Sequence, residues 1–250
     1  MHTALPDTVR AKLLRLAAVV VIGACILAAS AATAATLPQS GNPVPFGMES
    51  EPVSGGVAVK WRAVEVDIDA EQQVLAACRT GATCPAAAKG LLDIIAEGAG
   101  HLGLARVGLI NRAVDLAIAP ASDEAQWGVA DHWSPPFETL RTHRGDCEDY
   151  AIVKYLALLE AGLSRDDVKI VIVRNVLPNE DHAVVAARVD GKWLILDSRR
   201  LALVRDTEMA GSVPRFVLDE DGARRLVGST SSQTGPGARP SGTHRFVRPT

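Results

Sequence analysis

Residues 145–162 read GDCEDYAIVKYLALLEAG and form the best-defined predicted helix of the chain. Its apolar residues have helical spacing, and Gly162 is a typical residue for the end of a helix. Asp146 is a candidate N-cap, which places Cys147 in the first turn. The partial positive charge of a helix N-terminus stabilises a thiolate, the nucleophilic form of cysteine. Cys147 is therefore a candidate nucleophile, and a small buried hydrophobic residue is the alternative.

The residue pattern after this helix is typical of an antiparallel sheet. Asp190-Gly191 is a strong signal for a two-residue hairpin turn between two of the predicted strands. The predicted strands are residues 168–176, 182–189 and 193–197, with possible edge strands at 201–204 and 213–218.

The residues before this helix are mainly helical in pattern. Residues 57–78 also show some strand-like alternation, but the length of the stretch favours a helix. Further helices are predicted at 86–97 and 104–118, and the Pro-containing residues 120–145 are predicted as a loop. Helices followed by strands indicate an α+β fold, with the Cys147 helix packed on an antiparallel β-sheet.

The first residues of the chain resemble an export signal. Arg10, Lys12 and Arg15 precede an apolar stretch at 16–29 and small residues at 31–35. This order predicts a signal peptide over residues 1–35 and therefore a periplasmic location. The alternatives are an uncleaved membrane anchor and a lipoprotein acylated at Cys25.

Length and composition predict how the rest of the chain is divided into domains. A chain of 250 residues with 48% apolar and 22% charged residues suits one globular domain with extensions. We expect a linker at 36–56, the folded domain at 57–220 and a flexible tail at 221–250. The net charge of −3 and the lack of a long basic run argue against a nucleic-acid partner.

Three cysteines follow the predicted signal peptide. Cys78 and Cys84 are six residues apart and could form a local disulfide in an oxidising compartment. Two buried thiols are an equally good interpretation of the spacing. If the pair is bonded, Cys147 is the odd cysteine, which favours a reactive thiol.

The predicted hairpin brings a histidine and an aspartate together. With Asp190 and Gly191 as the two loop residues, His182 and Asp197 become diagonal neighbours on one face, roughly 7 Å apart at Cβ. A three-residue loop would destroy this alignment. The resulting hypothesis is a triad: Cys147 attacks a carbonyl, His182 carries the proton, and Asp197 orients the imidazole.

Carboxylates beside Cys147 oppose this chemistry. Asp146 and Glu148 flank the cysteine and Asp149 follows, and nearby negative charge disfavours a thiolate. A Ca²⁺ ion held by Asp146 and Glu148, with help from groups such as Asp131, would neutralise them. Helix capping by solvated acids is the alternative explanation.

The segment 145–151, with Lys154 on the same helix, resembles the nucleophile motif of bacterial transglutaminase-like cysteine proteinases. The segments 182–184 and 194–197 resemble the histidine and aspartate segments of that family, and 131–135 is also similar. The similarity extends over roughly residues 57–205. It implies a papain-like or transglutaminase-like fold and Ca²⁺-dependent activity, with Asp146 and Glu148 as metal ligands.

The resemblance also implies a function. Members of the family include periplasmic proteases that cut large surface adhesins, control biofilm attachment and are regulated by an inner-membrane receptor. We therefore expect a periplasmic cysteine endopeptidase acting on a protein substrate. The alternatives are a transglutaminase-type acyl transferase with the same triad and a non-catalytic binding module. The Cys78/Cys84 segment and the polar C-terminal tail depart from the family pattern and favour a different substrate.

Overall fold

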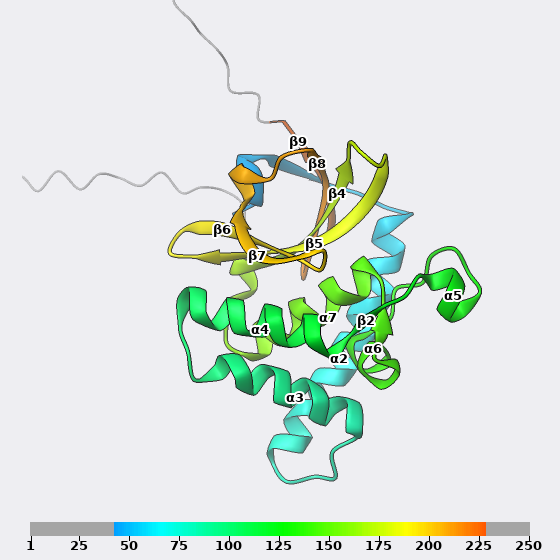
Figure 1. The fold of residues 1–250 in the computed structure, drawn as a ribbon, viewed down its shortest axis with the longest axis vertical. Helices are drawn as coiled ribbons and strands as arrows, with labels where there is room; N and C mark the ends of the chain where they lie inside the picture. Colours follow the sequence, from blue (N-terminus) through cyan, green and yellow to red (C-terminus); the bar gives the residue numbers. More distant parts are fainter. Residues whose placement is uncertain (1–42, 229–250) are drawn as a thin grey trace, which may run out of the picture. The chain divides into compact units, whose positions relative to one another are not determined.

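The computed structural model describes residues 43–228, which lie in one compact unit (Figure 1). The predicted signal peptide at 1–35, Cys25 and the tail beyond residue 228 lie outside the described residues. Among the residues described, no helix combines the length and the apolar character that a membrane span requires.

Helices form one layer of the domain and an antiparallel sheet forms the other (Figure 1). The sheet has the strand order β1-β9-β8-β4-β5-β6-β7 in the described part of the chain. Its strands are β1 (Glu49–Pro52), β4 (Val168–Asn175), β5 (Glu180–Val189), β6 (Lys192–Asp197), β7 (Arg200–Arg205), β8 (Ser212–Asp219) and β9 (Gly222–Val227). A separate parallel pair is formed by β2 (Ala119–Pro120) and β3 (Arg144–Gly145). The predicted α+β class is confirmed.

The helix that begins at Cys147 lies at the centre of the domain. The helices are α2 (Val57–Arg79), α3 (Ala86–Ala99), α4 (Gly103–Ala117), α5 (Asp123–Trp127), α6 (Pro136–Thr142) and α7 (Cys147–Glu160), with 3₁₀ turns η1 (Pro45–Gly47), η2 (Arg165–Asp167) and η3 (Asp206–Glu208). Helix α7 contacts β4 and β5 on one side and α3, α4 and α6 on the other. Its residues 149–158 are all buried, including the charged Asp149 and Lys154, because the sheet packs on one side of the helix and other helices pack on the other.

Both faces of the central strands are buried, which explains the uninterrupted apolar run at residues 170–173 of β4. Ile170 and Ile172 belong to the main core with the helices, whereas Val171 and Val173 belong to a second cluster on the other face. Phe46, from the stretch before β1, packs on that second cluster.

The predicted hairpin register is confirmed. Val185 pairs with Leu196 and Val189 with Lys192, so Asp190 and Gly191 form the two-residue loop. Asp190 has φ +50° and Gly191 φ +74°, the left-handed backbone that Asp-Gly turns provide at low cost.

The predicted domain boundaries are wrong at both ends. Strand β1 lies inside the proposed linker 36–56 and pairs with β9, which lies inside the proposed tail 221–250. Both strands are short and rich in charged residues, so their patterns are weak. Pairing between residues as distant as Glu49 and Val227 defines them, and the folded part therefore extends beyond 57–220 at both ends.

Two local predictions also need correction. The stretch 120–145 contains α5 and α6 as well as loop; Pro136 starts α6 because proline suits the first helical position. Strand β8 lies between β9 and β4, so the predicted edge strand at 213–218 is an inner strand. Residues 201–204 are confirmed as an edge strand, β7.

A disulfide joins Cys78 at the end of α2 to Cys84 just before α3, with the Cα atoms 5.0 Å apart. This confirms the local pairing and rules out two free thiols. Cys147 is the free cysteine among the described residues.

Candidate active site

Cys147 is the first residue of α7. The backbone just before it, at Gly145, packs closely against Asp149 and so fixes where the helix begins. A Cβ atom on Gly145 would lie 2.6 Å from both Cβ and Oδ2 of Asp149, so only glycine fits there. The Asp149 carboxylate accepts hydrogen bonds from the N–H groups of Ser134 (2.9 Å) and Asp146 (3.2 Å). The 145–151 motif therefore ties the loop around Ser134 to the start of the helix.

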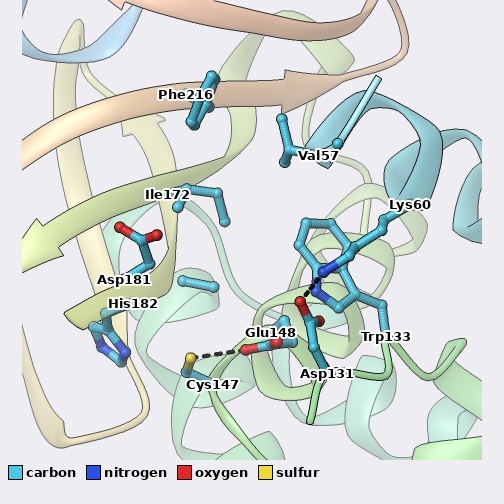
Figure 2. Close-up of a pocket in the computed structure, with 12 residues that line it drawn as sticks. Val57, Lys60, Asp131, Trp133, Cys147, Glu148, Ile172, Asp181, His182 and Phe216 are labelled. Carbon is cyan, nitrogen blue, oxygen red and sulfur yellow. Dashed lines mark hydrogen bonds and ion pairs between the residues drawn. The ribbon is translucent and has the colours of Figure 1, made fainter. Parts of the chain in front are cut away.

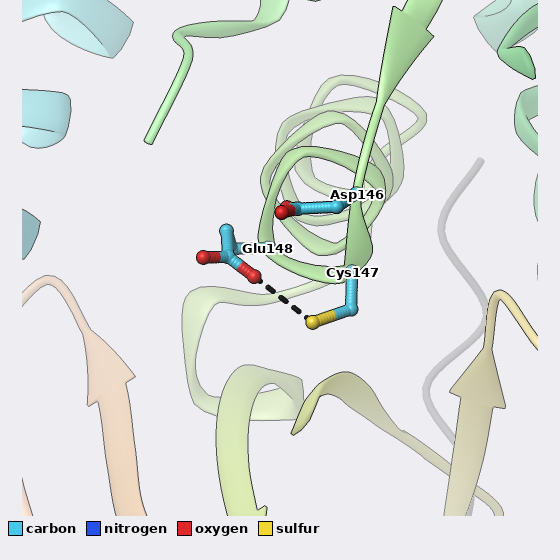
Figure 3. A group of neighbouring side chains, drawn as sticks. All are labelled: Asp146, Cys147 and Glu148. Carbon is cyan, nitrogen blue, oxygen red and sulfur yellow. Dashed lines mark hydrogen bonds between the residues drawn. The ribbon is translucent and has the colours of Figure 1, made fainter. Parts of the chain in front are cut away.

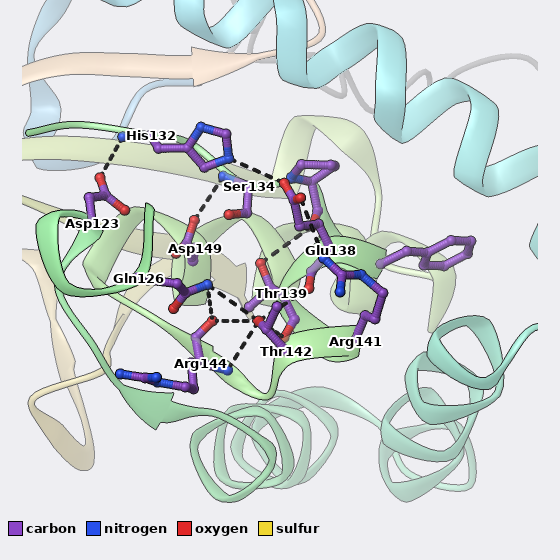
Figure 4. A network of polar contacts seen from close by, with 12 residues as sticks. Asp123, Gln126, His132, Ser134, Glu138, Thr139, Arg141, Thr142, Arg144 and Asp149 are labelled. Atoms are coloured by element: carbon purple, nitrogen blue, oxygen red, sulfur yellow. Dashed lines mark hydrogen bonds and ion pairs between the residues drawn. The ribbon is translucent and has the colours of Figure 1, made fainter. Parts of the chain in front are cut away.

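That loop is held by further polar contacts (Figure 4). Asp123 at the start of α5 accepts the N–H of His132, whose ring nitrogen Nε2 lies 3.2 Å from Glu138 Oε2 on α6. Ser134 is fully buried beside Asp149. Residues 131–135 and 145–151, the two neighbouring segments with a family resemblance, thus form one polar network.

His182 and Asp197 form a buried pair at the ends of their strands. His182 Nε2 lies 2.8 Å from Asp197 Oδ1, and the residues are 2% and 3% exposed. Asp197 also accepts the Arg199 N–H (3.0 Å) and Arg200 Nε (3.1 Å). Burial by itself would raise the pKa of Asp197, but the bonds from His182 and Arg199 and the positive charges outweigh it and hold that pKa well below its ordinary value. Asp197 is therefore ionised and holds the His182 ring at Nε2.

The second ring nitrogen of His182 is available for chemistry. Nδ1 is buried and has no hydrogen-bond partner among the described residues. His182 and Cys147 line the same pocket, in which the ring and the sulfur lie near each other (Figure 2). The structure thus brings together the three residues that the sequence proposed as a triad.

The thiol of Cys147 is protonated in this arrangement. Its sulfur donates to Glu148 Oε2 at 2.9 Å (Figure 3). Burial, followed by the charge of Glu148, raises the pKa of Cys147 well above its usual value, and a backbone hydrogen bond from Ala183 offsets only part of this. The expected stabilisation of a thiolate by the helix N-terminus is therefore outweighed, as the flanking acids suggested.

Acidic side chains converge beside the cysteine. Ligand atoms of Asp146, Cys147 and Glu148 lie within 4.8 Å of one another, and so do those of Asp123, Asp131 and Glu148. Burial and then the charge of Glu148 raise the pKa of Asp146 to about 8. Asp146 Oδ1 is buried without a hydrogen-bond partner among the described residues.

Asp123 was not anticipated as part of this cluster. Its side chain is 4% exposed, and it reaches the cluster because α5 folds back over the loop at residues 131–135. Asp131 is there as predicted, and its carboxylate forms an ion pair with Lys60 of α2. The position of Asp123 after the Ser122 cap indicates a helix start, and nothing in its local pattern indicates a metal site.

The pocket at Cys147 has a volume of about 340 Å³. Sequence analysis missed most of its wall, which is formed by Val57, Lys60, Trp133, Ile172, Asp181 and Phe216 (Figure 2). A second hollow, of about 670 Å³, also reaches Cys147 and is lined by Tyr150, Glu180 and Arg199 among others. The cysteine therefore stands between two open hollows.

Lys154, noted in the helix motif, forms a buried ion pair with Asp115 of α4, with Nζ and Oδ1 2.6 Å apart. The charge of Asp197 acts on both partners. This ion pair holds α7 against α4.

A helix that begins at a cysteine and packs on an antiparallel sheet carrying a histidine–aspartate pair defines the class of papain-like, transglutaminase-like cysteine hydrolases. Comparison with protein families agrees. The family described as "Bacterial transglutaminase-like cysteine proteinase BTLCP" matches residues 84–210, just over half of the 250 residues. The chain belongs to this family of cysteine proteases.

Solved structures share the fold. LapG of Legionella pneumophila is 21% identical, with 68% of this chain and 91% of that chain covered and a TM-score of 0.50. Its calcium-bound form is 20% identical, with 66% and 92% covered and a TM-score of 0.50. A comparison with curated proteins found no match. The structural likeness at this identity establishes the fold.

Proposed function

We propose that this chain is a periplasmic cysteine endopeptidase with Cys147, His182 and Asp197 as its catalytic triad. One observation carries the proposal: His182 uses Nε2 to bind the buried Asp197, and its Nδ1 has no partner within residues 43–228, in a pocket that it shares with Cys147. An imidazole oriented at one nitrogen and free at the other is what a general base requires.

The mechanism follows from these positions. His182 Nδ1 takes the thiol proton while the Cys147 sulfur attacks the carbonyl carbon of the scissile peptide bond. The imidazolium, stabilised by Asp197, then gives that proton to the leaving amine as the C–N bond breaks. A water molecule, deprotonated by His182, attacks the thioester and releases the carboxylate product and the Cys147 thiol.

We also propose a Ca²⁺ ion at Asp146 and Glu148. The residues fit a hard cation, since Asp146 Oδ1 is buried with no partner in the described part of the chain and the ligand atoms of Asp146 and Glu148 lie within 4.8 Å of each other. The similar Legionella protein has a calcium-bound structure. When bound, the ion would supply positive charge that offsets the two carboxylates beside the sulfur. Asp123 and Asp131 are the nearest further acids.

The substrate and the location belong to the same proposal. Membership of a protease family implies a protein substrate, and the charged and apolar pattern of residues 10–35 supports export to the periplasm. A large surface adhesin as substrate and an inner-membrane receptor as regulator are proposed by analogy with the family, so that cleavage would govern biofilm attachment.

The test is comparative proteomics of surface proteins in strains carrying the wild-type chain, Cys147→Ala or His182→Ala. We expect a surface protein to be released only by the wild type, and the exposed His101→Ala to behave like the wild type. Purified protein should cut peptide bonds without transferring acyl groups. Ammonia release from glutamine without peptide cleavage would favour a transglutaminase, and unchanged processing by Cys147→Ala would refute the triad.

A further inference from the structure

The pocket beside Cys147 has an apolar floor formed by one row of residues across three strands. Ile172 of β4 lies directly opposite Ala183 of β5 on one side and Phe216 of β8 on the other. All three belong to the face of the sheet that packs against the helices. Ala183 follows His182 directly in the chain and lines the pocket together with Cys147.

The side chains along this row increase in size away from the sulfur. Ala183 has the smallest side chain of the row, and Figure 2 shows Ile172 nearer to Cys147 than Phe216, which closes the far end. Val57, the first residue of α2, and the Trp133 ring complete the walls. The pocket is therefore an apolar hollow that opens at the nucleophile.

The charged groups around this hollow already have partners. Lys60 is paired with Asp131 and lies over the Trp133 ring, 5.6 Å from its centroid. Asp181 Oδ1 lies 3.2 Å from Arg174, and Glu148 accepts the Cys147 thiol. A charged substrate side chain would lose its hydration against Ile172 and Phe216 without gaining an unpaired partner, which is unfavourable.

Two of the residues that form these walls lie outside the segment that the family model matches. The family matches residues 84–210, whereas Val57 and Phe216 precede and follow that segment. Val57 and Phe216 are therefore pocket residues that the matched segment does not include.

We propose that this pocket takes one medium or large apolar side chain of the protein substrate, such as leucine, isoleucine, methionine or phenylalanine, at a fixed position close to the scissile bond. Val57 and Phe216 determine its size limit. The inference rests on the proposed protease function and specifies its substrate class. A site that held only small residues such as alanine would leave the hollow unfilled, with a loss of buried apolar contact.

The experiment is digestion of a proteome-derived peptide library by the whole protein with CaCl₂ present, with cleavage sites aligned from mass spectra. We expect wild-type cleavage to show medium or large apolar residues at one position within two residues of the cut. Val57→Phe should shift that same position toward alanine and glycine, lowering kcat/KM for a leucine peptide relative to its alanine counterpart by about 10-fold or more. Phe216→Ala should shift it toward tryptophan and phenylalanine.

Val59→Phe is the matched control, because Val59 is on the same helix but is 64% exposed. It should keep the wild-type preference. Cleavage with no apolar preference, or a preference that neither Val57→Phe nor Phe216→Ala changes, would overturn the pocket assignment and leave the protease function standing. Absence of any cleavage that depends on Cys147 would overturn the protease function, and the pocket assignment with it.

Discussion

His182 Nε2 lies 2.8 Å from Asp197 Oδ1 across the hairpin formed by β5 and β6. Three groups bind this carboxylate: the imidazole, the Arg199 N–H and the Arg200 guanidinium. The arrangement holds the ring in one orientation and keeps the carboxylate ionised. The contribution of the Asp197 charge to catalysis can be measured by a substitution that removes the charge and keeps the shape of the side chain.

Asp197→Asn should lower kcat/KM by about 10⁴-fold while leaving measurable turnover, because Asp197 orients the base without reacting itself. Cys147→Ala should lower it further, by about 10⁶-fold. Steady-state cleavage of a peptide substrate measures both. Equal activity of Asp197→Asn and wild type would contradict the orienting role.

Calcium should stabilise the fold through Asp146 and Glu148. A ligand that binds only the folded state adds about 2.7 kcal/mol at 100-fold over its Kd, so CaCl₂ should raise the Tm in thermal unfolding. Asp146→Asn and Glu148→Gln should each abolish that rise, whereas the exposed Asp166→Asn should retain it. An identical Tm in calcium and in chelator would refute the metal site.

Glu71 should make stability depend on pH. Burial raises its pKa from 4.5 to about 8, although the hydrogen bond from the Phe137 N–H lowers it. Between these values the folded state binds more protons than the unfolded state, so this carboxyl lowers the free energy of unfolding as pH rises from 4.5 to 8. Urea unfolding across that range should show a weaker decline for Glu71→Gln than for wild type. The exposed Glu97→Gln on α3 should follow the wild type.

Lys154→Met should destabilise the domain by about 3–5 kcal/mol, because it leaves Asp115 as an unpaired buried charge. Adding Asp115→Leu should recover most of the loss. Urea unfolding of the two variants measures the effect, with the exposed Lys89→Met as the control. If Lys154→Met were as stable as wild type, the Lys154–Asp115 ion pair would not be needed for stability.

Loss of the disulfide in Cys78→Ala/Cys84→Ala should cost about 2 kcal/mol, the chain-entropy value for a short loop. Peptide mapping after iodoacetamide treatment in denaturant without reductant should find Cys147 modified and the other two protected. Modification of all three would show that Cys78 and Cys84 are unpaired.

The candidate triad could be predicted because each part of it has a local signal. A capped helix start places Cys147, and an Asp-Gly turn sets the register that aligns His182 with Asp197. Periodicity and turn chemistry act between residues close in sequence, where the amino-acid order alone is informative.

The pocket and the sheet edges could not be predicted in this way. Trp61 Nε1 donates to the Asp219 carbonyl, 158 residues away, and Phe216 closes a pocket whose opposite wall begins at Val57. Asp123 joins the acidic cluster only through the path of a loop. No residue pattern around these positions predicts such contacts.

The sequence by itself determined the α+β order of elements, the helix that starts at Cys147 and the pairing of the His182 and Asp197 strands, because these depend on short-range geometry. The tertiary structure alone decided that β1 and β9 complete the sheet, which side chains line the pocket, and that the Cys147 thiol donates its hydrogen bond to Glu148. Those features arise from packing between distant segments, whose contacts are chosen by the free energy of the whole fold and not by neighbouring residues.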